Sequence, residues 1–284
     1  MQIGVGMFFT DYSITAPELG RALEERGFES LWAPEHSHIP VRTKSRFPLW
    51  DEIPKKYYDV MDPFVTLTAA AVATKTLKLG TGICLVAQRD PVQTAKLVSS
   101  IDHVSGGRFL FGVGNGWNAE EMADHGTAFK TRNKLARERI EAMKVIWTQG
   151  KPEYHGEMVD FPPMMTWPKP LQEPHPPIIV GGSFPYAARR AVAYGDGWIP
   201  HAALPPYDDV TEYLPDFRQM AEAAGRDPES LPVTVWGAQP DLDQLKKRSD
   251  LGVARVVVSM DSESSDVILP QLDRWAELMM KLGT

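Results

Sequence analysis

The sequence contains a single cysteine, Cys84, among its 284 residues. One cysteine excludes an internal disulfide, so the fold must depend on its hydrophobic core. Cys84 lies in the apolar run GTGICLV, and no basic residue adjoins it in the sequence. We therefore expect a small buried side chain at this position rather than a catalytic thiolate.

Basic residues are in the minority as well. The chain has 30 lysine and arginine residues against 37 acidic ones, which gives a formal net charge of −7. Because nucleic acids and anionic membranes bind basic surfaces, we expect neither as a partner. No segment reaches the roughly 18 apolar residues of a membrane span, and the first residues, MQIGVGMFFTD, do not resemble a signal peptide. We expect a cytoplasmic protein that acts on a small molecule.

Motifs for metal and serine chemistry are also absent. The chain has no H-E-x-x-H, no G-x-S-x-G and no cysteine and histidine cluster with ligand spacing. These absences argue against a metal centre and against a serine nucleophile. Chemistry on a phosphate-bearing cofactor is the better supported class.

Eight short apolar runs alternate with longer segments of helical pattern. Continuous apolar strands are typical of a parallel sheet that is buried on both faces, and eight is their number in the α/β (β/α)8 TIM barrel. The whole chain, 1–284, is long enough for one such domain. The predicted strands lie at 2–8, 30–34, 77–83, 108–113, 177–181, 197–200, 232–236 and 254–259.

Helix signals fill the intervals between these runs. Asp62-Pro63 and Asp90-Pro91 each combine an N-cap residue with proline at the first helical position. The clearest amphipathic helix is predicted over 131–149. Its apolar face carries Ala136, Ile140, Met143 and Trp147.

Two segments are too long for the short connections of a minimal barrel. Residues 36–61 are rich in aromatic and basic side chains, and residues 150–177 are rich in proline. Loops of this length in a compact domain usually serve function, and the aromatic content favours ordered, lid-like insertions. We expect both insertions to shape a substrate pocket.

The stretch GRFLFGVGNGWN, residues 107–118, leads an apolar run into three glycines. A Rossmann fingerprint needs G-x-G-x-x-G, but its third position falls here on Trp117, and Gly116 comes one residue too early. The stretch therefore indicates a close approach of the backbone to another group and no more.

In a TIM barrel the active site lies at the carboxyl ends of the strands. Glu35 and His36 follow the second predicted strand, where they can form a base with its orienting partner or remain ordinary structural residues. The other residues at such ends are His38, Gly82, Ile83, Gln88, Arg89, Asn115, Gly116, Trp117, Gly181, Gly182 and Ser183. Histidines without this context, which we expect to be structural, are His103, His125, His155, His175 and His201.

The sequence GGS at 181–183 precedes the helical pattern PYAARRAVAYG. Backbone N–H groups that glycines expose at a helix N-terminus can bind a phosphate. The same residues also suit a tight turn between a strand and a helix. The motif by itself leaves both interpretations open.

Three stretches together resemble the bacterial luciferase-like flavin and deazaflavin oxidoreductases: SLWAPEHSHIP (30–40), LKLGTGICLVAQRDPVQTAKLVSSIDHVSGGRFLFGVGNGW (77–117) and PPIIVGGSFPYAARRAVAYGDGWIP (176–200). The resemblance extends over nearly the full chain and is nearest to the branch that uses coenzyme F420. It implies a TIM barrel with insertions, a homodimer, and F420 or alternatively FMN as the cofactor.

The resemblance also implies roles for individual residues. His36 matches the active-site histidine, and Gly82-Ile83 matches a non-prolyl cis peptide behind the flavin ring. Where sugar-phosphate dehydrogenases of the family have an acidic residue, this chain has Trp117, and an indole there suits an apolar or aromatic substrate. The expected cofactor contacts are Gly82, Ile83, Asn115, Gly116, Trp117, Gly181, Gly182 and Ser183.

Three functions are compatible with this resemblance. The first is hydride transfer between reduced F420 and an organic substrate, with His36 as the proton donor. The second is an FMNH2-dependent monooxygenase, and the third is a non-catalytic flavin-binding relative. We predict the first.

Overall fold

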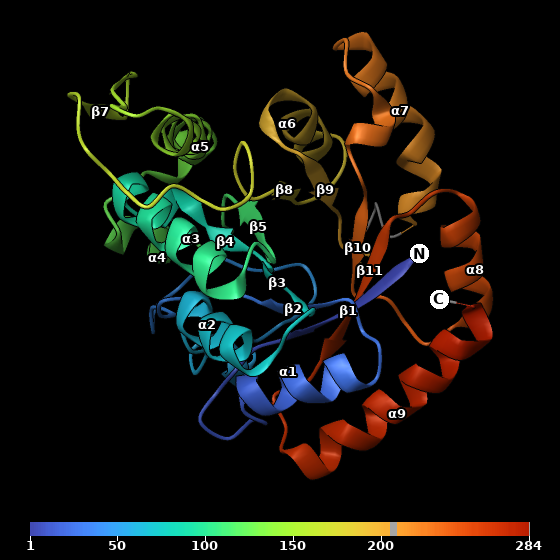
Figure 1. The fold of residues 1–284 in the computed structure, drawn as a ribbon. Coiled ribbons are helices and arrows are strands. Elements are labelled where there is room, and N and C mark those ends of the chain that lie inside the picture. Colours follow the sequence, from blue (N-terminus) through green and yellow to red (C-terminus); the bar gives the residue numbers. More distant parts are fainter. Residues whose placement is uncertain (205–208, 284) are drawn as a thin grey trace.

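The computed structural model describes residues 1–204 and 209–283, and within these one parallel sheet curves into a barrel (Figure 1). Its strands follow the order β10-β11-β1-β2-β3-β5-β8-β9, and β4 lies beside β5. Parallel bridges of Trp198 with Val233 and of His201 with Trp236 join the two ends of this order. The strands are Gln2–Met7 (β1), Ser30–Ala33 (β2), Lys78–Thr81 (β3), Cys84–Leu85 (β4), Phe109–Gly114 (β5), Ile178–Gly181 (β8), Gly197–Ile199 (β9), Thr234–Trp236 (β10) and Arg255–Met260 (β11).

The predicted TIM barrel is therefore confirmed, and each of the eight predicted runs contains a strand of the barrel. The run 77–83 differs in detail, because β3 ends at Thr81 and a separate β4 begins at Cys84. β3 pairs with both β2 and β5, whereas β4 pairs with β5. The chain between them contains the cis peptide bond of Gly82 and Ile83, as the resemblance implies.

Helices cover the outside of the barrel (Figure 1). Asp62 and Asp90 cap two of them, as predicted, by accepting hydrogen bonds from the first-turn N–H groups of Phe64 and Gln93 at 2.8 Å. The helix expected over 131–149 is α5. The helices are Ala16–Glu25 (α1), Pro63–Ala73 (α2), Pro91–Ser105 (α3), Ala119–Asp124 (α4), Arg132–Thr148 (α5), Tyr186–Tyr194 (α6), Leu214–Ala223 (α7), Leu242–Asp250 (α8) and Ser265–Leu282 (α9).

Two tryptophans fill the inside of the barrel. Trp32 is fully buried, and Trp236 packs partly buried in the same cluster. An added Cβ at Gly80 would lie 2.3 Å from the Trp32 ring, and one at Gly6 would lie 2.4 Å from the Trp236 ring. Such distances are far inside van der Waals contact, so the indoles fit only because neighbouring strands carry glycine there.

The first insertion, 36–61, contains the short 3-10 helix Lys55–Tyr57. The Glu120 carboxylate on α4 holds this insertion, since it accepts hydrogen bonds from the Ser45 hydroxyl at 2.6 Å and the Lys44 N–H at 2.9 Å. The insertion is thereby fastened to the carboxyl-end rim of the barrel.

The second insertion, 150–177, contains an antiparallel hairpin of Tyr154–His155 (β6) and Asp160–Phe161 (β7). The buried Glu138 carboxylate of α5 accepts hydrogen bonds from the N–H groups of Met158 and Val159 between these strands. The sequence pattern did not predict the hairpin, because strands of two residues are too short for a periodicity to show.

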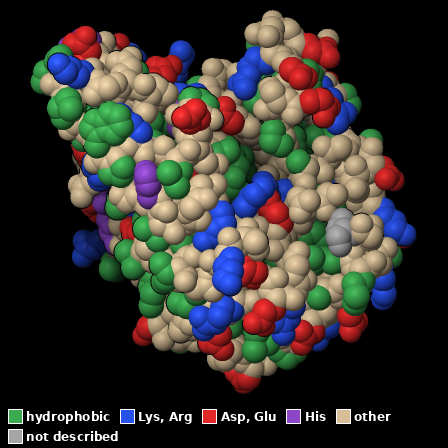
Figure 2. Space-filling model, viewed as in Figure 1, with side chains coloured by type: hydrophobic (Ala, Val, Ile, Leu, Met, Phe, Trp, Pro, Cys, Tyr) green, Lys and Arg blue, Asp and Glu red, His purple; other side chains and the backbone are tan. Residues whose placement is uncertain are grey.

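Acidic and basic side chains are interspersed over the face that Figure 2 shows. No helix among the described residues is long and apolar enough to cross a membrane.

Candidate active site

The carboxyl ends of the strands bring the predicted residues to one side of the rim. His36 follows β2, Gly82-Ile83 lies between β3 and β4, Trp117 follows β5, and Gly182 follows β8. The strands β2, β3, β5 and β8 are consecutive neighbours in the sheet. The structure therefore groups these candidates at one mouth of the barrel.

Ile83 forms part of the floor of this mouth, where it packs against the interior cluster around Trp32. An added Cβ at Gly114 would lie 2.2 Å from the Ile83 side chain, and one at Gly181 would lie 2.9 Å from it. The glycines that end β5 and β8 thus leave room for Ile83 and keep the floor apolar.

The imidazole of His36 is buried beside a carboxylate. Its Nδ1 lies 2.8 Å from Oε2 of Glu121, and the two side chains are 6% and 0% exposed. The other oxygen of Glu121 accepts a hydrogen bond from the Ser37 N–H at 3.1 Å. A carboxylate at Nδ1 favours the tautomer with its proton on that nitrogen, which leaves Nε2 to exchange a proton with a ligand.

Glu35 has partners other than His36. Its carboxylate pairs with the Arg89 guanidinium and accepts a hydrogen bond from the Leu85 N–H at 2.7 Å. Glu35 is buried, and removing either partner would leave part of its carboxylate without a hydrogen bond. The predicted pairing of Glu35 with His36 is therefore wrong: Glu35 fixes the segment after β3, and Glu121 is the carboxylate at the histidine.

Glu121 is the site residue that the sequence interpretation missed, because the short helix α4 was not predicted. A signal for this helix exists: Asn118 stands three residues before Glu121, which is the spacing of a capping box. The Asn118 side chain does accept a hydrogen bond from the Glu121 N–H, at 3.1 Å. The Glu121 carboxylate, however, binds His36, a contact that no local pattern indicates.

The residues after β5 pack onto α4 and α5. Asn115 donates a hydrogen bond to the side chain of Asn133 at 2.6 Å. Gly116 has a φ of 74°, and an added Cβ would lie 2.6 Å from Cε of Met122. The Trp117 ring meets the His36 ring edge-on, with 5.6 Å between centroids. Trp117 therefore stands directly beside the His36 imidazole.

The turn after β8 differs from an open phosphate cradle. The Gly182 N–H donates to the Ile199 carbonyl at 3.0 Å, and the Gly182 carbonyl accepts from the Trp198 indole at 2.9 Å. The expectation that this glycine exposes its N–H to a ligand is therefore wrong. Helix α6 nevertheless begins, after Pro185, without a side-chain cap.

Two arginines near this turn have no carboxylate partner among the described residues. Nη2 of Arg190 lies 3.6 Å from where a Cβ on Gly182 would stand, and Nε of Arg190 and of Arg132 are both buried without a partner. Burial lowers the pKa of both side chains, and the charge of Arg190 lowers the pKa of Arg132 further. Two partly buried cations that repel each other suit an anionic ligand such as a phosphate.

A neutral donor lies elsewhere on the rim. The buried Nε2 of Gln88 has no hydrogen-bond partner within residues 1–204 and 209–283, and it lies 3.8 Å from where a Cβ on Gly116 would stand. The rim thus offers an amide donor near β5 and guanidinium donors near β8. These residues fit a flavin-like group, which carries ring heteroatoms at one end and a phosphate at the other.

Two further titratable side chains, Cys84 and His201, have pKa values shifted by burial. Cys84 is completely buried, and burial raises the pKa of its thiol, so the expected buried side chain is confirmed. Burial lowers the pKa of His201 to about 4, which keeps this imidazole neutral at neutral pH. Within the described part of the chain, no group of three or more histidine, cysteine or acidic side chains is placed to hold a metal ion.

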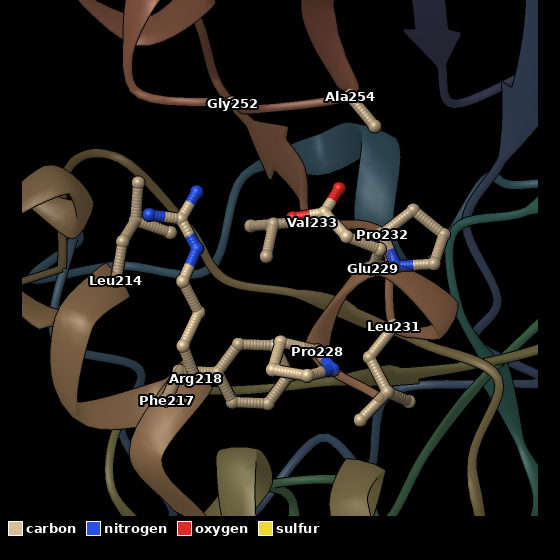
Figure 3. Close-up of a pocket in the computed structure, with 10 residues that line it drawn as sticks. All are labelled: Leu214, Phe217, Arg218, Pro228, Glu229, Leu231, Pro232, Val233, Gly252 and Ala254. Carbon is tan, nitrogen blue, oxygen red and sulfur yellow. The ribbon is translucent and has the colours of Figure 1, made fainter. Parts of the chain in front are cut away.

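The cavity in Figure 3 lies at the opposite end of the barrel. Its volume is about 100 Å³, and Val233 and Ala254, which line it, precede β10 and β11. Arg218 of α7 also lines it, and its Nη2 donates to the Leu251 carbonyl at 2.6 Å. The amino ends of the strands are the face away from His36, so this cavity is no part of the site.

The fold and the rim define a TIM-barrel protein with an enzyme-like site at the carboxyl ends of its strands. The model of the luciferase-like monooxygenase family matches residues 14–239. The chain belongs to this family.

The chain also has relatives of modest sequence identity. An uncharacterized protein of Mycobacterium tuberculosis is 36% identical over 285 residues, which cover 97% of this chain and 98% of that one. The F420-dependent hydroxymycolic acid dehydrogenase of the same species is 27% identical over 236 residues, which cover 80% of this chain and 60% of that one. The solved structure of monooxygenase RslO1 from Streptomyces bottropensis has a TM-score of 0.78 at 18% identity, covering 100% of both chains, and bears on the fold alone.

Proposed function

We propose that this protein is an oxidoreductase that uses coenzyme F420 and transfers a hydride between the reduced deazaflavin and an organic substrate. The observation that carries the proposal is that Arg132 and Arg190, beside the turn at Gly182, have no carboxylate partner among the described residues. Two such cations support a phosphate-bearing cofactor. The F420-dependent relative supports a deazaflavin over a flavin.

When bound, the deazaflavin supplies the hydride-transfer chemistry. The guanidinium groups of Arg132 and Arg190 hold the phosphate, and the uncapped start of α6 contributes its dipole. Gln88 donates its free N–H to the ring end. The other cofactor contacts that we propose are the predicted Gly82, Ile83, Asn115, Gly116, Trp117, Gly181 and Ser183.

His36 moves the proton that accompanies the hydride. Glu121 holds Nδ1, so Nε2 is the ring nitrogen left to face the substrate. Replacing His36 by asparagine should lower kcat by about a hundredfold or more while the Kd of the cofactor stays the same. Unchanged turnover would remove this role from His36.

The experiment that tests the cofactor is a titration of the purified protein with oxidised F420 and, separately, with FMN, followed by tryptophan fluorescence. Trp117 lies at the rim and reports on binding there. Micromolar binding of F420 with weak FMN binding supports the proposal. The reverse preference would favour the FMNH2-dependent monooxygenase, and binding of neither would overturn both.

We also propose that the chain forms one domain and acts in the cytoplasm as a homodimer. Helix α2 supports the dimer, because it is apolar on its outer face as well as its inner one: Val65 and Val72 are 68% and 72% exposed. Covering these side chains with the α2 of a second copy removes them from water.

A further inference from the structure

Five aromatic rings, with His36 among them, form a closed circuit of contacts. Trp117 follows β5, and the other four, His36, Phe47, Trp50 and Tyr57, come from the first insertion. We call this set the aromatic circuit. The ring centroids are 5.2 Å apart for His36 and Tyr57, 4.9 Å for Tyr57 and Trp50, 4.9 Å for Trp50 and Phe47, 5.6 Å for Phe47 and Trp117, and 5.6 Å for Trp117 and His36.

Tyr57 is the most buried of Phe47, Trp50 and Tyr57, with 8% of its surface exposed. Within the described chain the Tyr57 hydroxyl makes no hydrogen bond, yet it is not among the fully buried polar atoms that lack a partner, so it keeps some access to solvent. Burial raises the pKa of Tyr57, so the hydroxyl remains a protonated donor at neutral and moderately alkaline pH. The circuit thus holds a hydrogen-bond donor that the protein does not use.

The two lysines that precede Tyr57 are both in ion pairs. Lys55 pairs with Asp59, and Lys56 pairs with Asp261 at 2.7 Å. Neither ammonium group is therefore free to hold a substrate carboxylate or phosphate. An anion placed against the ring of Tyr57 would lose its hydration without gaining a counter-charge from these lysines.

We propose that the aromatic circuit selects a neutral, largely apolar ring compound that carries one carbonyl or hydroxyl oxygen, and that Tyr57 donates the hydrogen bond that directs this oxygen to His36. The inference rests on the proposed function, because that oxygen marks the carbon that is reduced or oxidised. Reduction of a ketone would add a hydride from reduced F420 to the carbonyl carbon and a proton from Nε2 of a doubly protonated His36 to the oxygen, which leaves the neutral ring with its proton on Nδ1 beside Glu121. The products are the alcohol and oxidised F420.

The test compares three probes of similar size: α-tetralone, which has the ketone, tetralin, which lacks it, and naphthoate, which is an anion. Each is titrated into the protein, first without and then with saturating F420, and binding is followed by the intrinsic tryptophan fluorescence, to which Trp50 and Trp117 of the circuit contribute. We expect α-tetralone to bind about fivefold to tenfold more tightly than tetralin, because one hydrogen bond typically contributes a difference of this size to the binding affinity. Naphthoate should bind more weakly than either.

Tyr57→Phe removes the hydroxyl and keeps the ring. It should weaken α-tetralone binding by the same fivefold to tenfold, roughly one hydrogen bond, and leave tetralin binding unchanged. The matched control is Tyr58→Phe, since Tyr58 is the neighbouring tyrosine and is 53% exposed. Thermal melting of each variant checks that it folds, and the comparison of probes on the unmodified protein needs no variant.

Any of three results would overturn the inference. They are equal affinity for α-tetralone and tetralin, tight binding of naphthoate, and an equal loss of affinity for both neutral probes in Tyr57→Phe. The F420 titration distinguishes failure of the proposed substrate class from failure of the proposed function. If F420 binds and the probes show no such selectivity, the substrate class fails and the proposed function stands. If F420 does not bind, the proposed function fails as well.

Discussion

Nδ1 of His36 and Oε2 of Glu121 lie 2.8 Å apart, although 85 residues separate the two in the chain. His36 lies in the loop after β2, whereas Glu121 belongs to α4, which follows β5. Glu121 is fully buried, and its contacts are with His36, the Ser37 N–H and its own helix cap. Because a buried carboxylate is stable only with such partners, the pair ties the position of α4 to the ring that we propose as the proton donor.

Replacing Glu121 by glutamine should lower kcat about a hundredfold and leave the Kd of F420 unchanged. Glutamine keeps the size of the side chain but removes the charge that orients Nδ1, as with other carboxylates that orient a catalytic histidine. Steady-state kinetics that separate kcat from KM provide the measurement. Asp124→Asn is the control on the same helix, since Asp124 is 60% exposed and pairs with His38 instead. Equal losses in both variants would contradict a positioning role for Glu121.

Replacing Arg190 or Arg132 by glutamine should each weaken F420 binding about tenfold or more, because a charge-assisted hydrogen bond to phosphate is lost. The measurement is the fluorescence titration, repeated at rising salt, where the unmodified protein should lose affinity faster than the variants. Arg189→Gln is the matched control, as Arg189 is the exposed neighbour on α6. The Arg132 and Arg190 variants test the phosphate site better than a substitution of Gly182 would, because a side chain at Gly182 would strain the backbone at a φ of 126°. Unaltered affinity in both variants would place the phosphate elsewhere.

Gly80→Ala should lower the free energy of unfolding by about 1–3 kcal/mol, the usual cost of overpacking a core. The added Cβ would lie 2.3 Å from the Trp32 ring, which is held on all sides inside the barrel. Urea unfolding measures the change. Gly150→Ala is the control, because a Cβ there meets nothing within 4 Å. A neutral Gly80→Ala would mean that Trp32 can move aside.

The attachment of the first insertion should depend on pH through Glu120. Hydrogen bonds from the Ser45 hydroxyl and then from the Lys44 N–H lower its pKa from 4.5 to about 2. A carboxyl with a lower pKa in the folded state stabilises the fold fully above the unfolded value, and this contribution is lost as the pH falls from 4.5 through about 2. Hydrogen exchange of the Lys44 and Ser45 amides, corrected for intrinsic rates, should therefore accelerate below pH 4.5 in the folded protein.

Glu120→Gln should accelerate the same two amides at neutral pH, where the unmodified protein protects them, because the charged acceptor is gone. Amides of β5 serve as the internal control and should keep their protection. Protection of Lys44 and Ser45 that is the same in both proteins at every pH would show that Glu120 does not hold the insertion.

Val72→Glu should convert the proposed homodimer into monomers, because a charge in the middle of an apolar interface must be desolvated without a partner. Light scattering coupled to gel filtration measures the mass. Val41→Glu is the control: Val41 is also a fully exposed valine, but it lies on the first insertion. A dimer that survives Val72→Glu would exclude this face of α2 from the interface.

The sequence by itself determined the barrel, because its evidence is local. Strand runs such as 108–113, the proline-marked caps at Asp62 and Asp90, and the apolar face of 131–149 each depend on residues within one element, and the structure contains all of them. The rule that parallel strands place their carboxyl ends at one rim then located the site around His36.

Only the tertiary structure decided which groups meet at that rim. Adjacency in the chain favoured Glu35 as the partner of His36, but strand order and packing placed Glu121 there and gave Glu35 to Arg89. In the same way, the carbonyl of Ile199 on the next strand occupies the N–H of Gly182. Such contacts join residues far apart in sequence, and their free energy depends on burial and on the remaining partners in space, which local patterns do not contain.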